Sequence, residues 1–214
     1  MTQSRWATLR QEYTQAGLLE GDVAAHPLKQ LEIWLHQAQT AGVLEPNAMT
    51  LASATTDGVP SARVVLLKGL DEHGIVFYTN YESHKAREIE ANPRVAATLV
   101  WLDLERQVCI SGEVTRVSRE ESEAYFATRP RGSQLGAWAS AQSSVVKDRA
   151  TLEAQLAEVE ARFLGRDVPT PEHWGGYRIA PRTVELWQGR PNRLHDRLCY
   201  TRVEGTWRVD RLSP

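Results

Sequence analysis

Residues 49–68 read M-T-L-A-S-A-T-T-D-G-V-P-S-A-R-V-V-L-L-K, two β-rich runs on either side of the turn pair Asp57-Gly58. An Asp-Gly pair between such runs is a strong signal for a β-hairpin. We therefore expect strands at residues 49–55 and 61–68. Beyond the hairpin, alternating apolar residues predict a third strand at residues 74–79.

The rest of the chain predicts further strands separated by helices. The strands are expected at residues 94–102, 106–117, 177–179, 183–187, 199–203 and 206–211, with Glu204-Gly205 as a hairpin link between the last two. Helices are expected around Trp6, Leu9 and Tyr13, from Pro27 with Leu28, Leu31, Leu35 and Ala38 inward, from Ser83 to Pro93, from Ser118 to Pro130, and over residues 147–163. Without strict β-α-β alternation, this order predicts a mainly β, α+β fold: an antiparallel barrel with peripheral helices.

Composition excludes several classes of protein. The net charge of −2 over 214 residues argues against a nucleic-acid partner, because counterion release needs a concentrated basic surface. No apolar stretch approaches the roughly 20 residues that span a bilayer, and Cys109 and Cys199 lie too far apart in sequence for a C-x-x-C pair. We expect a cytoplasmic protein with free thiols. The histidines show no zinc spacing, so no metal is expected.

The sequence has neither G-x-G-x-x-G after a strand nor a P-loop, so a bound phosphate would be held by side chains. Tyr125 and Arg129 are four residues apart on a predicted helix, with Ser133 in the turn after it; they form either a phosphate clamp or a core tyrosine and a helix-terminal arginine. Arg63 and Lys68 have opposite parity, so a shared ligand requires a bulge or a bend at the end of their strand.

The segment 185–197, E-L-W-Q-G-R-P-N-R-L-H-D-R, is the most unusual one. In an extended chain Arg193, His195 and Arg197 would point to one side, which places two guanidinium groups around one imidazole. The alternative interpretation is a solvated edge strand with surface arginines.

Several segments together resemble the pyridoxamine 5′-phosphate oxidase family, in the same order along nearly the whole chain. They are R-V-V-L-L-K (63–68), L-E-R-Q-V (104–108), R-P-R-G-S-Q-L-G-A-W-A-S-A-Q-S (129–143), W-G-G-Y-R (174–178), the segment 185–197 and the closing W-R-V-D-R-L-S-P. The resemblance implies a split β-barrel that binds FMN and a homodimer with two sites at the subunit interface, each drawing residues from both chains.

The resemblance also implies roles for individual residues. Those implied for FMN are Arg63, Val64, Val65, Leu66, Leu67, Lys68, Tyr78, Thr79, His84, Lys85, Gln107, Gln142, Ser143, Trp187 and Arg197. Those implied for the substrate are Lys68, Tyr125, Arg129 and Ser133 around its phosphate, Arg193, Leu194 and His195 over its ring, and Arg10 and Tyr13 in a lid. Residues 1–20 would form this mobile lid, and residues 21–214 a single domain.

The implied reaction is the oxidation of pyridoxine or pyridoxamine 5′-phosphate to pyridoxal 5′-phosphate. FMN would accept a hydride, dioxygen would reoxidise the flavin to give hydrogen peroxide, and the amine would also release ammonia. Arg193 and His195 would position and polarise the substrate as catalytic residues. Two alternatives remain at this point: a non-catalytic split-barrel flavin carrier or sensor, and a related oxidase of another amine, such as a phenazine-pathway enzyme.

One position departs from the family, which commonly has S-R-K where this chain has Ser83-His84-Lys85. A permanent charge near the FMN phosphate is thereby replaced by a titratable one. We expect FMN affinity to be higher while His84 is protonated and to fall as the pH rises through its titration.

Overall fold

The hairpin expected from residues 49–68 is present in the computed structural model, which describes residues 12–14 and 17–214. Its strands are β1 (Ala48–Ala54) and β2 (Pro60–Leu66). Gly58 has a positive φ of 89° in the turn between them, a conformation that glycine adopts without a steric cost. Strand β2 ends before Lys68, which lies in the connection to the next strand.

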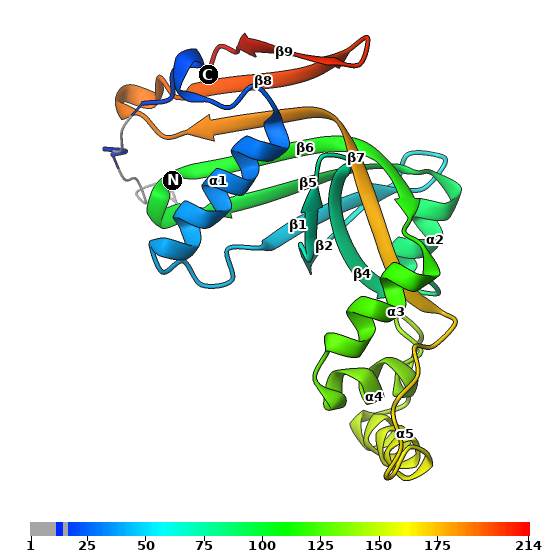
Figure 1. Cartoon of the computed structure of the whole chain (residues 1–214). Coiled ribbons are helices and arrows are strands. Elements are labelled where there is room, and N and C mark those ends of the chain that lie inside the picture. The colour runs from blue at the N-terminus through cyan, green and yellow to red at the C-terminus, as the bar shows by residue number, and fades with distance from the viewer. Residues whose placement is uncertain (1–11, 15–16) are drawn as a thin grey trace, which may run out of the picture. The chain divides into compact units, whose positions relative to one another are not determined.

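The remaining elements follow the predicted order (Figure 1). The strands are β3 (Gly69–Asp71), β4 (Gly74–Asn80), β5 (Arg94–Trp101), β6 (Arg106–Arg116), β7 (Trp174–Gln188), β8 (Asp196–Val203) and β9 (Thr206–Arg211). The helices are α1 (Pro27–Thr40), α2 (His84–Ala91), α3 (Arg119–Thr128), α4 (Arg131–Ala139) and α5 (Arg149–Arg162). The described helices include none with the length and apolar character that a membrane span requires.

Strand pairing gives the order β2-β1-β5-β6-β7-β4-β3, with β8 paired to β7 and β9 to β8. The pairs β3–β4, β4–β7, β7–β8 and β8–β9 are all antiparallel. Strand β7 changes partner along its length: residues 174–179 pair with β4, and residues 183–188 pair with β8. The predicted mainly β, antiparallel fold with peripheral helices is confirmed.

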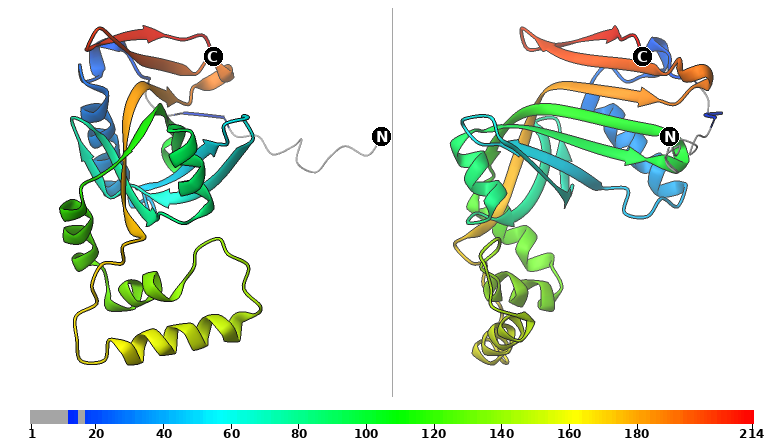
Figure 2. Two further views of the ribbon diagram at one scale, coloured as in Figure 1. Left: turned by 90° about the vertical axis from the view of Figure 1, so that its right-hand side faces the viewer. Right: turned by 180° about the vertical axis from the view of Figure 1, so that it is seen from behind.

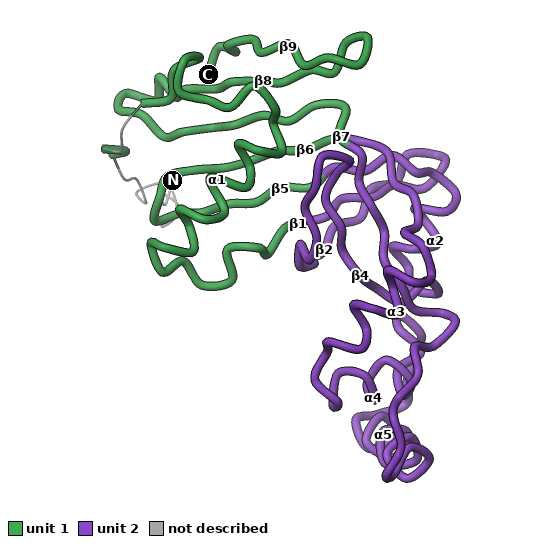
Figure 3. The backbone as a smooth tube through the Cα atoms, viewed as in Figure 1, with its two compact units in different colours: residues 1–49, 97–111, 181–214 green, residues 50–96, 112–180 purple. Residues whose placement is uncertain are grey.

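The chain divides into two compact units (Figure 3). Unit 1 contains residues 1–49, 97–111 and 181–214, and unit 2 contains residues 50–96 and 112–180. In unit 1, α1 buries Leu28, Leu31, Trp34 and Ala38, and Trp34 meets Trp101 edge to face. The predicted inward stripe of this helix therefore includes Trp34, while Leu35 is only half-buried. A single domain over residues 21–214 stays a prediction.

In unit 2, helices α3, α4 and α5 share a core with the start of β7. Its buried residues are Phe126, Leu135, Phe163, Val168 and Trp174. Helices α4 and α5 lie side by side in both views of Figure 2. Serine caps begin α2 and α3 as predicted, since Ser83 accepts from the backbone N–H of Ala86 and Ser118 from that of Glu121.

Three local predictions are wrong. The two strands expected at 177–179 and 183–187 are one strand, β7, that runs through Pro181. The turn expected after Pro130 is helix α4, which buries Leu135 in the core. The N-terminal helix does not reach Tyr13, because residues 12–14 are not helical; Trp6 and Leu9 lie outside the described residues.

Candidate active site

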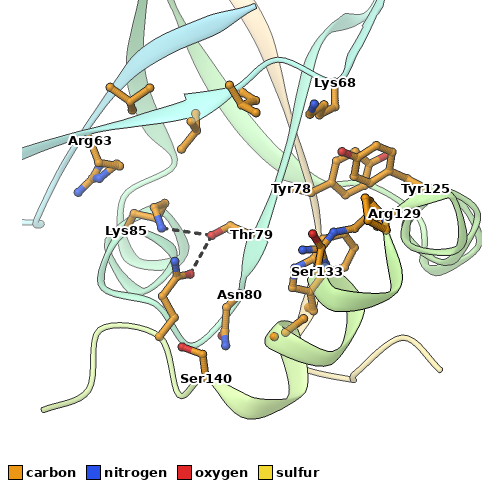
Figure 4. A pocket seen from close by; sticks show the side chains of 18 residues that line it. Arg63, Lys68, Tyr78, Thr79, Asn80, Lys85, Tyr125, Arg129, Ser133 and Ser140 are labelled. Atoms are coloured by element: carbon orange, nitrogen blue, oxygen red, sulfur yellow. Dashed lines mark hydrogen bonds between the residues drawn. The ribbon is translucent and has the colours of Figure 1, made fainter. Parts of the chain in front are cut away.

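Unit 2 contains a pocket of about 790 Å³. Strands β2 and β4, helices α2 and α4 and the connection between α3 and α4 contribute its walls. Figure 4 shows two groups of cationic side chains on opposite sides: Arg63 and Lys85 on one, and Lys68 and Arg129 on the other. Arg63 and Lys68 both line this pocket although they have opposite parity in the sequence. Of the bulge and the bend that could explain this, the structure favours a change of direction at the strand's end, because β2 ends at Leu66 and Lys68 lies in the connection that follows.

Lys85 is a buried cation on the first side of the pocket. Only 8% of its surface is exposed, and its Nζ lies 3.2 Å from Thr79 Oγ1 and 3.4 Å from Ser83 Oγ. Burial, together with the neighbouring charge of Arg63, lowers the pKa of Lys85. Within the described part of the chain Lys85 forms no ion pair, so its charge is available to an anion in the pocket.

Arg63, in contrast, has a carboxylate beside it. Its Nη2 lies 3.3 Å from Glu88 Oε2, which also accepts hydrogen bonds of 2.5 Å from Ser53 and Ser61. Burial would raise the pKa of Glu88, but these hydroxyls and the charges of His84 and Arg63 outweigh it and lower the pKa. A charged Glu88 therefore fixes Arg63 at the edge of the pocket.

His84 is not among the residues that line the pocket. Its Nε2 lies 3.6 Å from the other oxygen of Glu88, and its backbone N–H donates to Ser143 Oγ at 3.1 Å. Any effect of His84 on a bound phosphate would therefore pass through Glu88 and the 142–143 loop. Gln142 lines the pocket and accepts a hydrogen bond from Thr79 Oγ1.

The second side of the pocket is built from Lys68, Tyr125, Arg129 and Ser133. The prediction that Arg129 shares a helical face with Tyr125 is wrong. Arg129 is the C-cap of α3 and already has extended backbone angles. Ser133 belongs to α4. Burial lowers the pKa of Arg129, although it remains a cation at any physiological pH. All four predicted residues of the phosphate cradle nevertheless meet in one pocket.

Tyr78 and Tyr125 stack against each other beside Arg129, with ring centroids 3.9 Å apart. Burial, with a smaller contribution from Glu121, raises the pKa of Tyr78 to about 12, and burial also raises that of Tyr125. Both hydroxyls therefore keep their protons and can donate to an anion. Gly176 leaves room for this stack, because a Cβ there would lie 2.7 Å from Tyr78 Cε1.

A second group of predicted residues lies in unit 1. The ring of Trp187 is 4.6 Å from that of His195, and Tyr13 meets both rings edge to face. Arg197 pairs directly with Trp187 across β7 and β8, and its Nε and Nη2 bind Glu185 at 2.7 and 3.0 Å. Gln107 donates to Cys109 Sγ.

The predicted extended chain over Arg193, His195 and Arg197 is wrong. A short turn over Pro191–Arg193 precedes β8, and Asn192 and Arg193 have φ of 56° and 61°. Left-handed backbone at two residues other than glycine is strained, which makes this loop a candidate site. It places His195 so that Nδ1 accepts from the Arg190 N–H at 3.1 Å. Arg193 and Leu194 are exposed.

Some of the other predicted residues line the pocket and some do not. Val64, Val65 and Leu66 line it, whereas Leu67 is buried, Ser143 is exposed in its loop and Arg10 lies outside the described residues. The prediction did not include several residues that line the pocket: Asn80, Pro130, Gly136, Ala137, Ser140 and Trp174. Trp174 is the first residue of the W-G-G-Y-R motif (174–178). No role was predicted for it, because it lies far in sequence from the other residues of the pocket.

The pocket suits the phosphate end of a flavin mononucleotide. The buried ammonium of Lys85 has no carboxylate partner in the described part of the chain, the hydroxyls of Thr79 and Ser83 flank it, and a second cationic group faces it across the pocket. Together with the antiparallel sheet, these features define a flavin-binding split-barrel protein.

Comparison with known proteins identifies the family. Residues 35–163 match the family described as pyridoxamine 5′-phosphate oxidase, and residues 174–214 match the pyridoxine 5′-phosphate oxidase C-terminal dimerisation region. The chain is 61% identical over 208 residues to the pyridoxine/pyridoxamine 5′-phosphate oxidase of Rubrobacter xylanophilus, covering 97% of this chain and 96% of the relative. It is 54% identical to that of Thermosynechococcus vestitus, covering 99% and 100%. The chain therefore belongs to the pyridoxamine 5′-phosphate oxidase family.

Solved structures agree with the fold. The structure of PhzG from Burkholderia lata, in complex with tetrahydrophenazine-1-carboxylic acid, superposes with a TM-score of 0.87 at 34% identity, over 92% of this chain and 98% of that one. An FMN-binding protein from Nostoc punctiforme, related to pyridoxamine 5′-phosphate oxidase, superposes with a TM-score of 0.70 at 16% identity, over 90% and 99%. The predicted split-barrel fold is confirmed.

Proposed function

We propose that this protein oxidises pyridoxine 5′-phosphate and pyridoxamine 5′-phosphate to pyridoxal 5′-phosphate, using FMN and dioxygen. The observation that carries the proposal is the pair of cationic groups on opposite sides of one pocket. A non-catalytic flavin carrier needs only the first of them. The second, around Arg129, provides for another phosphate and so for a phosphorylated substrate.

In this proposal the first group holds FMN. Lys85, with Arg63 fixed by Glu88, binds its phosphate, and Thr79 and Gln142 contribute hydrogen bonds. The exposed apolar side chain of Val64 and its neighbours in β2 provide a surface for the flavin. When bound, FMN accepts a hydride from the substrate and passes the electrons to dioxygen, which becomes hydrogen peroxide.

The second group selects the substrate by its phosphate. Lys68 and Arg129 supply charge, and Tyr125 and Ser133 supply hydroxyl donors. Each charge-assisted hydrogen bond contributes roughly 1.5 to 3 kcal/mol, so two or more discriminate strongly against the free alcohol or amine.

His195 and Arg193 orient the substrate ring. Because His195 Nδ1 accepts from the Arg190 N–H, a neutral His195 carries its proton on Nε2. That N–H can donate to the substrate and hold it in place. Arg193 adds a cation from the strained loop. Tyr13, which packs on His195 and Trp187, would belong to the lid.

The working unit in this proposal is a homodimer formed through the C-terminal dimerisation region, with residues from both chains at each site. We also propose a cytoplasmic location. Two half-buried free thiols, Cys109 and Cys199, are consistent with a reducing compartment.

Aerobic turnover of the purified, FMN-loaded protein with pyridoxine 5′-phosphate tests the function. Pyridoxal 5′-phosphate and hydrogen peroxide should form in equal amounts, and the double variant Arg193→Ala/His195→Ala should lose both. Bound FMN without turnover of either phosphorylated vitamer would refute the proposal and favour a carrier or an oxidase of another amine.

A further inference from the structure

The guanidinium of Arg129, a residue that lines the pocket, has a buried nitrogen without a hydrogen-bond partner. Among the side chains that the structure describes, its Nη1 is the buried polar atom that has no hydrogen-bond partner. Leaving a buried N–H unpaired costs free energy, more so on a charged group. Such an atom is stable only where other contacts hold the side chain in place.

Two aromatic rings hold this guanidinium. Its central carbon lies 4.7 Å from the ring centroid of Trp174 and 5.3 Å from that of Phe126. Trp174 is 6% exposed at the start of β7, and its ring is within 10° of parallel to the ring of Tyr78. A guanidinium on the face of an indole is attracted to the ring quadrupole, most strongly when both are shielded from water.

The backbone alone does not fix the direction of Arg129. Helix α3 has ended at Thr128, and Arg129 is a C-cap with extended angles, so helix geometry no longer limits its rotamers. A free arginine side chain also has many rotamers to lose on binding a ligand. The ring of Trp174 removes this freedom before the ligand arrives.

We propose that Trp174 is a positioning residue for the substrate phosphate: its ring holds the guanidinium of Arg129, which lines the pocket, in place before the ligand binds. This inference rests on the proposed function, because it assigns the anion beside Arg129 to the phosphorylated substrate. The face of the Trp174 ring holds Arg129, and the volume that the side chain fills in the core is not what positions it.

The variants Trp174→Leu and Trp174→Phe separate these two roles, because leucine fills space without a ring face and phenylalanine keeps a weaker one. Trp138→Leu is the matched control. Trp138 packs against the same core and has Arg162 4.8 Å from its ring, yet it does not line the pocket.

Steady-state turnover of the FMN-loaded proteins gives the first measurement. In Trp174→Leu the KM for pyridoxine 5′-phosphate should rise about 10- to 30-fold with little change in kcat, and Trp174→Phe should fall between this variant and wild type. Turnover of free pyridoxine, which has no phosphate, should be unaffected. Equilibrium dialysis with pyridoxal 5′-phosphate should show weaker binding by the same factor, while FMN affinity is unchanged.

An equal rise in KM for Trp174→Leu and Trp138→Leu would overturn the inference, as would a parallel loss of turnover with pyridoxine and its phosphate. Either result means that Trp174 only fills space. Should the leucine variant not fold, Trp174→Phe decides by the same criteria. If wild type neither binds nor oxidises phosphorylated vitamers, the proposed function fails first and the inference falls with it.

Discussion

Replacing Lys85 with methionine should weaken FMN binding and stabilise the apo-protein at the same time. Among the described residues, the ammonium has the hydroxyls of Thr79 and Ser83 as its hydrogen-bond partners and no carboxylate, so a phosphate would supply a charged contact. A charge-assisted hydrogen bond of roughly 1.5 to 3 kcal/mol corresponds to about 10- to 150-fold in Kd. Methionine has a similar length and no charge to bury, so the apo-protein should unfold at a higher urea concentration.

The stability effect also has a pH signature. Because the pKa of Lys85 in the folded protein lies below the ordinary value of 10.5, the folded apo-protein binds fewer protons than the unfolded chain between these two pKa values. Its free energy of unfolding should therefore rise with pH in this alkaline window. In Lys85→Met this part of the rise should be absent.

Titration of apo-protein with FMN, followed by quenching of flavin fluorescence, measures the affinity, and urea unfolding measures the stability. Lys29→Met is the matched control, because Lys29 is an exposed lysine of α1 that pairs with Glu32. An FMN affinity within about twofold of wild type would refute the role of Lys85, since the smallest expected effect is about tenfold. A less stable apo-protein would refute the argument from burial.

Three other substitutions test separate parts of the molecule. Arg129→Met should raise the KM for pyridoxine 5′-phosphate by about tenfold or more without changing FMN affinity. If enzyme kinetics and FMN titration showed that substrate and FMN affinity fall equally, the two phosphate-binding groups of the pocket would not be separate. FMN affinity should fall from about pH 6 to 8.5 in wild type but not in His84→Arg, and identical profiles would disprove the effect of His84. Tyr177→Phe removes a 2.6 Å hydrogen bond to the partly exposed Glu90 and should cost about 1 kcal/mol in urea unfolding at neutral pH. Burial alone would raise the pKa of Glu90, but Tyr177 and Arg116 lower it, so this cost should shrink as acid protonates Glu90; a constant cost down to low pH would contradict the assignment.

Local signals were sufficient for much of the fold. The strand at 206–211 has the predicted limits because the Glu204-Gly205 turn, with φ of 49° and 84°, fixes where it starts. The prediction divided strand β7 into residues 177–179 and 183–187, and Pro181, a residue type that is usually excluded from the interior of a sheet, lies in the gap. In the structure Pro181 lies between the residues paired with β4 and those paired with β8, so it belongs to neither of these two ladders.

Helix α4 shows the limit of such signals. Pro130 and the two glycines of 131–139 favour a turn, but the helix forms because it buries Leu135 against Phe126 and Trp174. These partners are distant in sequence or on another helix, so periodicity within the segment cannot reveal the contact.

Many of the residues that line the pocket were predicted from the sequence, but their geometry was not. From the residue types alone, the pair Tyr125 and Arg129 and the segment around Arg193 could each have had either a functional or a purely structural role. The resemblance to the family favoured the functional role in both cases. The resemblance could not show that Arg193 has a left-handed backbone or that the guanidinium of Arg129 packs on the ring of Trp174, because both depend on contacts between separate segments.

The distribution of charge connects stability with function in this chain. Outside the pocket, several arginines have carboxylate partners: Arg116 with Glu90, Arg178 with Asp71, Arg197 with Glu185, and Arg211 with Glu20 and Asp196. The half-buried Arg106 instead donates to the amide oxygens of Gln188 and Gln37. Inside it, Lys85 and Arg129 have none among the described residues. Removing a partner from a buried charge is destabilising, so the apo-protein keeps these cations at a cost to its own stability. Ligands that bring two phosphates reverse this cost, and the folded state should therefore gain stability in proportion to the logarithm of each ligand's concentration above its Kd. In the proposed function, the same unpaired charges that weaken the empty protein would select a phosphorylated cofactor and a phosphorylated substrate.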